Sequence, residues 1–267
     1  MLINRSTLGR VGIWARELRF DPDPSAIADA AAELEEHGWS ALWIPDAGGD
    51  IFGAVDVLLD ATRSVAIATG ILNIWMQDPE EVARESDARW KSGRFVLGLG
   101  ASHAALVEQY ARPYSAMREY LDALDAATPP VPDGARLLAA LGPKMVALSG
   151  DRAAGAHPYL VTAEHTRIAR EILGPDAVLA PELGVVLDGD VARGRERARE
   201  HVADYLELPN YANSMRRMGF TEHDLRDGGS DRLVDAVADH VCIQVVGPMG
   251  QPLPRETWRQ LAPVLLG

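Results

Sequence analysis

RFVLGLGASHAALVE, residues Arg94–Glu108, is the stretch of this sequence that indicates the fold most clearly. It begins with the apolar strand Phe95–Leu97, passes through a Gly-Leu-Gly turn to Gly100, and presents Ser102 and His103 before an apolar, helix-like run. A continuous apolar strand is typical of a parallel sheet buried on both faces, and glycines at its end allow close approach to the backbone. Parallel α/β enzymes keep their chemistry where such strands end. We therefore expect Ser102 and His103 at a binding site, the alternative being an ordinary turn with an exposed His.

Strand-like and helix-like segments alternate along all 267 residues, which predicts a parallel β/α architecture. We predict eight strands, over residues 10–15, 41–45, 65–71, 95–97, 136–141, 156–161, 178–187 and 240–246. The predicted helices cover residues 26–37, 55–63, 78–91, 115–126, 142–152, 163–173, 190–206, 212–218 and 255–265. Eight such units predict one (β/α)₈ TIM barrel domain over residues 1–267. The segment Ser230–Ala238 runs almost directly into the last strand, which predicts that the last crossover helix is shortened or missing.

Composition narrows the class of partner. Lys and Arg number 26 against 39 Asp and Glu, and the net charge of −13 argues against nucleic acid or an anionic membrane. The single cysteine, Cys242, excludes an internal disulfide and a Cys-based zinc site, and no cluster has metal-ligand spacing. The N-terminus lacks the apolar core of a signal peptide, and no apolar run approaches eighteen residues. We expect a cytoplasmic protein that binds a small molecule.

A glycine and a helix start follow the fifth predicted strand, at Gly142, Pro143 and Lys144. Free backbone N–H groups and the positive end of a helix suit a phosphate group, and Lys144 adds a formal charge. The sequence therefore predicts a phosphate site here, with an ordinary strand-to-helix turn as the alternative.

Two further strand ends carry candidate ligand contacts. Gly70 lies inside the buried third strand, which indicates a bulge or an unusual peptide against which a flat ring could rest. Asp46 ends the second strand and can accept a hydrogen bond from a ligand, the alternative being a loop-capping role. Trp14 and Trp75 lie near strand ends on the same expected ligand face.

Eight collinear segments resemble the luciferase-like monooxygenase superfamily, and specifically its deazaflavin (coenzyme F420)-dependent oxidoreductases from actinobacteria. They cover most of the chain and are HGWSALWIPD, IATGILNIW, GRFVLGLGASHAALVE, MREYLDALDA, LLAALGPKM, GAHPYLVTAEHT, LLAPELGVVL and ADHVCIQVV. The fold of this superfamily is a (β/α)₈ barrel, and its members commonly pair, so the resemblance also implies a homodimer.

The resemblance implies roles for individual residues. Gly70-Ile71 matches the step where relatives form a non-prolyl cis peptide behind the central deazaflavin ring. Asp46 matches an acidic position near the reactive ring, and His103 occupies a position after the fourth strand where some relatives carry a catalytic carboxylate. These two are the expected catalytic residues. The expected cofactor contacts are Gly70, Ile71, Asn73, Gly100 and Ser102 around the ring, and Gly142, Pro143 and Lys144 at the phosphate.

The function implied by the resemblance is hydride transfer between coenzyme F420 and a small organic substrate. FMN shares the ring shape and the phosphate, so an FMN-dependent monooxygenase or reductase is the first alternative. Ala47 stands where sugar-phosphate-oxidising relatives carry a catalytic His, and the last crossover is short. These departures support a second alternative, a non-catalytic barrel that binds a flavin or a partner protein.

Overall fold

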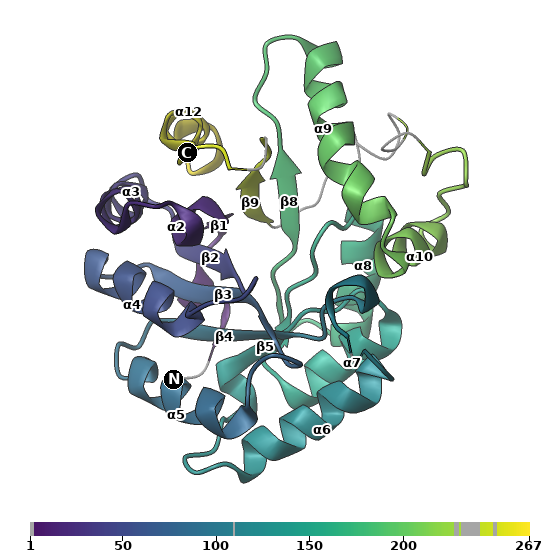
Figure 1. Ribbon diagram of the computed structural model, residues 1–267. Coiled ribbons are helices and arrows are strands. Elements are labelled where there is room, and N and C mark those ends of the chain that lie inside the picture. The colour runs from purple at the N-terminus through teal and green to yellow at the C-terminus, as the bar shows by residue number, and fades with distance from the viewer. Residues whose placement is uncertain (1–2, 109, 227–229, 231–240, 248–249) are drawn as a thin grey trace.

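The computed structural model describes residues 3–108, 110–226, 230, 241–247 and 250–267. In this part of the chain a parallel sheet curls into a barrel, with helices packed around its outside (Figure 1). The strands are β1 (Val11–Trp14), β2 (Ala41–Pro45), β3 (Ala66–Asn73), β4 (Phe95–Gly100), β5 (Arg136–Leu138), β6 (Gly155–Ala156), β7 (Val178–Leu179), β8 (Glu182–Val185) and β9 (Val241–Val245). The helices are α1 (Arg5–Leu8), α2 (Glu17–Phe20), α3 (Pro24–Glu36), α4 (Ile51–Ala61), α5 (Pro79–Trp90), α6 (Pro113–Ala126), α7 (Pro143–Arg152), α8 (Ala163–Leu173), α9 (Val191–Leu206), α10 (Pro209–Arg217) and α12 (Arg255–Leu265), with 3₁₀ turns η1 (Ala104–Leu106) and η2 (Asp133–Ala135).

The two ends of the sheet belong to one bent strand. The strand order is β7-β6-β5-β4-β3-β2-β1-β9-β8, so β7 and β8 lie at opposite ends although they follow each other in the chain. Only Ala180 and Pro181 separate them, and Pro181 has no N–H to donate to a ladder. Its carbonyl instead accepts a hydrogen bond from the Cys242 N–H at 2.8 Å. The predicted strand 178–187 therefore divides into two pieces that close the predicted eight-membered barrel.

Most predicted elements form close to their predicted bounds, and the differences have local causes. The helix predicted from residue 55 begins at Ile51, because the Asp50 carboxylate accepts a hydrogen bond from the Gly53 N–H at 2.8 Å and caps it. The apolar run after His103 forms only the 3₁₀ turn η1. The short last crossover predicted at 230–238 lies outside the described residues, apart from Ser230.

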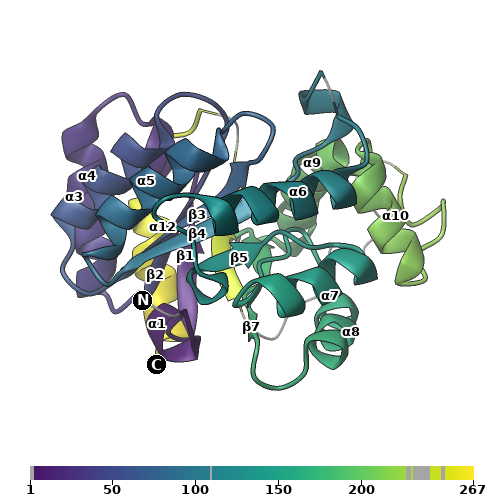
Figure 2. The same ribbon diagram turned by 90° about the horizontal axis from the view of Figure 1, so that it is seen from below.

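The sheet is apolar on both faces, as a parallel sheet covered by helices requires. The interior of the barrel is filled by side chains such as Trp43, Val96, Leu137 and Cys242. The other face of the strands packs against the surrounding helices through a larger cluster. Figure 2 shows α3, α4 and α5 on one side of the strands and α6, α7 and α8 along the other.

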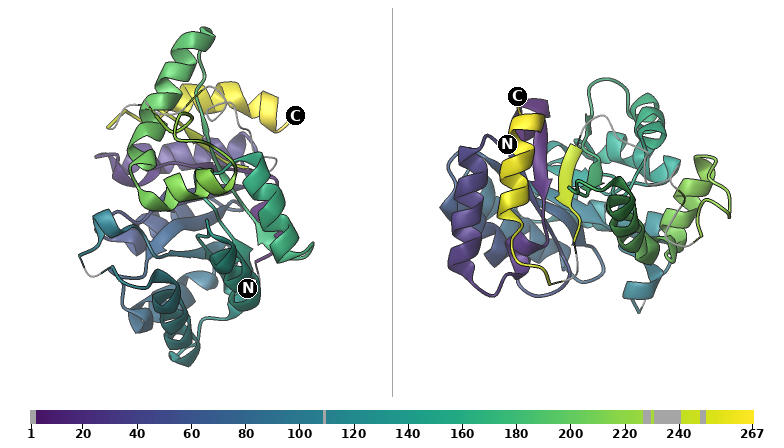
Figure 3. Two further views of the ribbon diagram at one scale, coloured as in Figure 1. Left: turned by 90° about the vertical axis from the view of Figure 1, so that its right-hand side faces the viewer. Right: turned by 90° about the horizontal axis from the view of Figure 1, so that it is seen from above.

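The C-terminal helix α12 lies beside α3, as the right panel of Figure 3 shows. Two of its residues, Arg255 and Arg259, form ion pairs with Glu33 of α3. Helices α9 and α10 lie apart from this pair, next to the extended strand β8 (Figures 1 and 3). No helix in the described ranges combines the length and the apolar character needed to cross a membrane.

Candidate active site

A cavity of about 570 Å³ lies at the carboxyl ends of the strands. We call it the main cavity. Six of the residues expected from the sequence line it: Asp46, Gly70, Ile71, Ser102, His103 and Gly142. Trp14 also lines it, as expected. Asn73, Gly100, Pro143 and Lys144 are not among its lining residues. Loops after six parallel strands thus bring together residues that are far apart in the sequence, at the end of the barrel where this fold carries its sites.

Strand β3 bulges at Gly70. Ile44 of β2 pairs with Thr69 and the next residue, Pro45, pairs with Ile71, so Gly70 has no partner on that side. The pairing with β4 shifts between Ala68 and Leu72 in the same way. A Cβ atom at Gly70 would lie 2.5 Å from Nε1 of Trp14, so the indole occupies the space that a side chain would need. The predicted bulge is confirmed, and Trp14 packs against it.

Thr69 repairs the ladder that the bulge interrupts. Its hydroxyl donates to the Gly98 carbonyl at 2.9 Å and accepts from the Gly98 N–H at 2.7 Å. A Cβ atom at Gly98 would lie 2.1 Å from the Thr69 carbonyl oxygen, so only glycine fits at this close crossing of β3 and β4. Sequence reasoning missed Thr69, although a Thr next to the bulge glycine was the available signal.

The Gly70–Ile71 peptide is trans, since the cis bond in the described part of the chain is Thr128–Pro129. The expected cis peptide is therefore wrong, and the bulge alone distorts the strand. Gly100, expected to contact a cofactor, instead makes room for the Ile71 side chain, which lies 2.9 Å from where a Gly100 Cβ would be. Ile71 itself reaches the main cavity.

The carboxylate of Asp46 is buried and fully engaged. Its Oδ1 lies 3.5 Å from Nη1 of Arg19, whose guanidinium also donates to the carbonyls of Pro45 and Gly48. Its Oδ2 accepts from the Asn73 N–H and from the Gln77 amide, both at 3.1 Å. Burial lowers the pKa of Arg19, while the neighbouring Asp46 acts in the opposite direction. This arrangement holds the loop after β2 against the end of β3.

Asn73 and Trp75 brace the loops behind the main cavity. The Asn73 side-chain oxygen accepts from the Trp75 N–H at 3.1 Å, and the Trp75 indole donates to the Ala101 carbonyl at 2.6 Å. Asn73 is 4% exposed, so its side chain is occupied in this network. Asn73 thus supports the ligand face from behind, where the sequence predicted a direct cofactor contact.

His103 is positioned by a strained neighbour and by α10. Ser102 has a φ of 55°, a left-handed conformation that costs a non-glycine residue about 1–2 kcal/mol. The amide nitrogen of Asn210 donates to His103 Nδ1 at 3.1 Å, so the neutral imidazole carries its proton on Nε2. The ring centroid lies 5.0 Å from that of Tyr211. Burial lowers the pKa of His103, which keeps the ring neutral at pH 7.

Three tyrosines form one wall of the main cavity. They are Tyr159 after β6, Tyr205 on α9 and Tyr211 on α10, and we call them the tyrosine wall. The Tyr159 hydroxyl donates to Oε1 of Gln244 at 2.7 Å and lies 2.9 Å from the Tyr205 hydroxyl. Burial raises the pKa of Tyr159 and Tyr211 well above the usual value. Sequence reasoning missed this wall, because its members come from three separate elements.

The end of the main cavity near α7 suits an anion. Gly142 caps this helix, and open space lies where its Cβ would be. Lys144 is exposed and Pro143 has no N–H, so neither supplies the expected contact from inside the cavity. Arg16 and Arg217 do line the cavity, and neither forms an ion pair with another described residue. Arg217 lies at this end, because it acts on His165, whose Nε2 lies 2.9 Å from the Leu141 carbonyl oxygen. Arg16 follows β1 and adds positive charge to another part of the lining.

Known proteins resemble this chain in sequence and in fold. An uncharacterized protein of Mycobacterium tuberculosis, Rv1360, is 31% identical over 134 residues, which are 46% of this chain and 39% of that protein. The aligned region thus spans well under half the length of this relative. The coenzyme F420-dependent tetrahydromethanopterin reductase of Methanopyrus kandleri has a TM-score of 0.72 at 16% identity, over 96% of this chain and 98% of that one.

Two further structures share the fold. An F420-dependent secondary alcohol dehydrogenase with an F420–acetone adduct has a TM-score of 0.64 at 15% identity, over 88% of this chain and 93% of that one. The FMN-bound oxygenating constituent of 3,6-diketocamphane monooxygenase from Pseudomonas putida has a TM-score of 0.57 at 12% identity, over 97% and 95% of the two chains. The sequence profile of the luciferase-like monooxygenases matches residues 6–248, which is most of the chain and includes every residue lining the main cavity. The chain therefore belongs to the luciferase-like monooxygenase family.

Proposed function

We propose that this protein is a coenzyme F420-dependent oxidoreductase that transfers a hydride between the deazaflavin and a small organic substrate. The observation that carries the proposal is the bulged end of β3, which brings Gly70 and Ile71, with the Trp14 indole packed beside them, to the lining of the main cavity. Its volume of about 570 Å³ lies within the range typical of cofactor and ligand pockets. Two of the structural neighbours, the tetrahydromethanopterin reductase and the secondary alcohol dehydrogenase, are F420-dependent, which supports the same assignment.

The residues present fit a ring that carries a phosphorylated side chain. Small residues, Ala101, Ala139 and Ala140, line the cavity between the bulge and the Gly142 loop, and they leave room for a planar group. The guanidinium groups of Arg16 and Arg217, which form no ion pair with another residue in the described ranges, lie on the lining and suit a phosphate. When bound, the deazaflavin supplies the hydride chemistry itself.

The side chains of this protein orient the substrate and move a proton. His103 is the best placed for proton exchange, because it lines the cavity, is neutral and carries its proton on Nε2. Asn210 fixes that tautomer through Nδ1. The carboxylate of Asp46 is committed to Arg19, Asn73 and Gln77, so we assign it to holding the site in shape.

A fluorescence titration with coenzyme F420, and with FMN in parallel, tests the proposal. Saturable F420 binding that is tighter than FMN binding supports it. We would compare Ala47→Trp, which places an indole in the main cavity, with Ala105→Trp, an exposed site outside the cavity lining. Binding that survives Ala105→Trp and is lost in Ala47→Trp assigns the cofactor to this cavity.

The same titration decides between the alternatives. A clear preference for FMN would replace the proposal with a flavin-dependent monooxygenase or reductase. Failure to bind either cofactor, in protein that unfolds cooperatively, would favour a non-catalytic barrel.

A further inference from the structure

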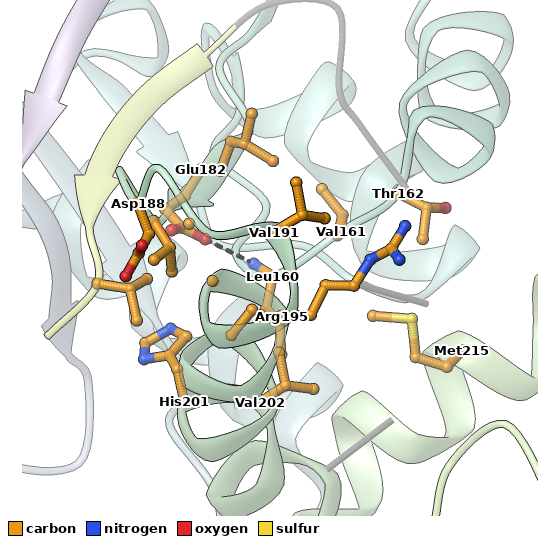
Figure 4. Close-up of a pocket in the computed structure, with 16 residues that line it drawn as sticks. Leu160, Val161, Thr162, Glu182, Asp188, Val191, Arg195, His201, Val202 and Met215 are labelled. Atoms are coloured by element: carbon orange, nitrogen blue, oxygen red, sulfur yellow. Dashed lines mark hydrogen bonds between the residues drawn. The ribbon is translucent and has the colours of Figure 1, made fainter. Parts of the chain in front are cut away.

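A second cavity of about 340 Å³ lies between the inner face of β8, the loop after β6 and helix α9 (Figure 4). We call it the α9 cavity. It shares no lining residue with the main cavity. The tyrosine wall lies between the main cavity and the α9 cavity. The loop after β6, α9 and α10 each contribute a tyrosine to the lining of the main cavity and an aliphatic residue to the lining of the α9 cavity. The aliphatic residues are Leu160 after β6, Val202 on α9 and Met215 on α10.

Two acids line this cavity, and they differ in their partners: Asp188 is paired with Arg193 and Arg197, whereas Glu182 lies among aliphatic side chains. Glu182 begins β8 and pairs in register with Cys242, a residue of the barrel interior, so its side chain faces inward. It is 0% exposed. Its Oε2 accepts the Leu160 N–H at 3.0 Å, the contact drawn in Figure 4, while Oε1 has no hydrogen-bond partner among the residues that the structure describes. No described residue forms an ion pair with it.

The contact between Glu182 and Leu160 is built into the backbone. Leu160 has a φ of 50°, a left-handed conformation that is unfavourable for a residue with a branched side chain. This conformation accompanies the donation of its N–H to the buried acid. Buried polar atoms are nearly always paired, and the exceptions occur where a ligand or a function takes the free position. The free Oε1 beside a cavity is such an exception.

Glu182 is a neutral acid in this setting. Burial raises its pKa to about 8, and the Leu160 N–H opposes that shift only in part. Because Oε2 accepts a hydrogen bond as the carbonyl oxygen, the proton sits on Oε1, which is then a donor without an acceptor. A neutral carboxylic acid in an apolar site is a known device for donating a hydrogen bond to an oxygen atom.

We propose that the α9 cavity is a separate binding site for a small, uncharged molecule with an aliphatic body and a carbonyl oxygen that accepts a hydrogen bond from Glu182 Oε1. Leu160, Val202 and Met215 match the aliphatic body. Asp188 and Arg195 also line the cavity, and the Asp188 carboxylate is already paired with Arg193 and Arg197. A neutral Glu182 adds no counter-ion, so a charged ligand would gain little in return for the hydration that it loses. The proposal extends beyond the proposed function, because neither F420 nor FMN takes part in it.

The affinity of this site depends on pH in a predictable way. Glu182 is the group around the cavity that changes charge between pH 6.5 and 9.5, where it loses the proton that it donates. Asp188, with a pKa of about 2, stays ionised, and Arg195 stays cationic. Burial lowers the pKa of His201 and raises that of Tyr159, Tyr205 and Cys242, so these four stay neutral or nearly so.

We would test the site with 2-heptanone as the probe and with heptylamine and heptanoate as its charged counterparts. Binding to the full chain, without cofactor, is measured by isothermal titration calorimetry at pH 6.5 and 9.5. We expect saturable 2-heptanone binding at pH 6.5 that weakens about thirtyfold at pH 9.5, as the acid with a pKa of about 8 ionises. Tighter binding of heptylamine than of 2-heptanone would overturn the proposal.

Three variants complete the test, and two of them form a matched pair. Glu182→Gln keeps an acceptor for Leu160 and a donor for the probe at every pH, so its 2-heptanone affinity should be equal at pH 6.5 and 9.5. Ala198→Phe fills the α9 cavity from α9 and should abolish binding, whereas Ala192→Phe lies on the exposed part of that helix and should leave it intact. Binding that persists in Ala198→Phe would locate the probe elsewhere and refute the site. Because no cofactor is present, this result is independent of the F420 titration.

Discussion

The buried acid Glu182 predicts a specific pH dependence of stability. Its pKa is about 8 in the folded protein and 4.5 for an ordinary Glu, so between these values the folded state binds the proton and the unfolded state does not. Stability from this group is therefore fully present below pH 4.5 and is lost as pH rises through about 8. This sign is opposite to that of a carboxylate held in an ion pair.

The size of the effect follows from the two pKa values. One proton changes the free energy of unfolding by about 1.4 kcal/mol per pH unit. Over the whole interval from 4.5 to about 8, the contribution of Glu182 falls by about 5 kcal/mol. Glu182→Gln cannot ionise, keeps the volume of the side chain and retains an acceptor for the Leu160 N–H. The variant should therefore keep the fold and lack this pH-dependent contribution to the free energy of unfolding.

The assay is urea unfolding of the wild-type protein and of Glu182→Gln at pH 5.5 and pH 7.5. Buried histidines such as His157, whose pKa burial lowers to about 4, also respond to pH in this range. These histidines contribute equally to the free energy of unfolding of both proteins, so their contribution cancels in the difference between wild type and Glu182→Gln. We expect the stability of the wild type relative to Glu182→Gln to fall by about 2.7 kcal/mol between the two pH values. A difference that stays constant would show that Glu182 is ionised in the folded state, and the reasoning for a neutral donor would fail.

Three further predictions concern the main cavity. Thr69→Val leaves the N–H and carbonyl of Gly98 unpaired and should cost about 2–4 kcal/mol in urea unfolding, whereas Thr69→Ser should cost under half as much. Arg19→Met leaves the Asp46 carboxylate buried without its cation and should cost about 3–5 kcal/mol, and the double variant with Asp46→Asn should recover part of that loss. If the proposed function is correct, His103→Gln should lower the turnover of hydride transfer about 10²–10⁴-fold without weakening F420 binding. Equal losses of turnover and of F420 affinity would point to a structural role for His103.

The fold was largely predictable from the sequence because its signals are local. Proline, an aspartate cap and glycine mark the start or end of helices such as α5, where the Asp78 carboxylate accepts from the N–H groups of Glu80 and Glu81. Strand β2 and helix α8 begin and end at the predicted residues. The break between β7 and β8 was not predicted, because the bend at Pro181 is needed only when the barrel closes.

The site was predictable only in part, because the topology places strand ends together but does not decide which side chains enter the cavity. Gly70 lies near the carboxyl end of β3, and His103 and Gly142 lie in the loops after β4 and β5, so their positions at one end of the barrel follow from the topology. Whether a side chain enters the cavity depends on contacts between distant elements. The Asp46 carboxylate binds the Asn73 N–H directly and also contacts Arg19 and Gln77, and local sequence patterns do not pair these residues.

Helix α9 shows the limit of local patterns most clearly and links the two cavities. Not one of its sixteen residues is fully buried, and its charged sequence predicts a solvated face. Yet one stripe of this helix serves both cavities: Ala198 and Val202 line the α9 cavity, and Tyr205, one turn further along the same stripe, completes the wall of the main cavity. A displacement of α9 would therefore change both cavities together.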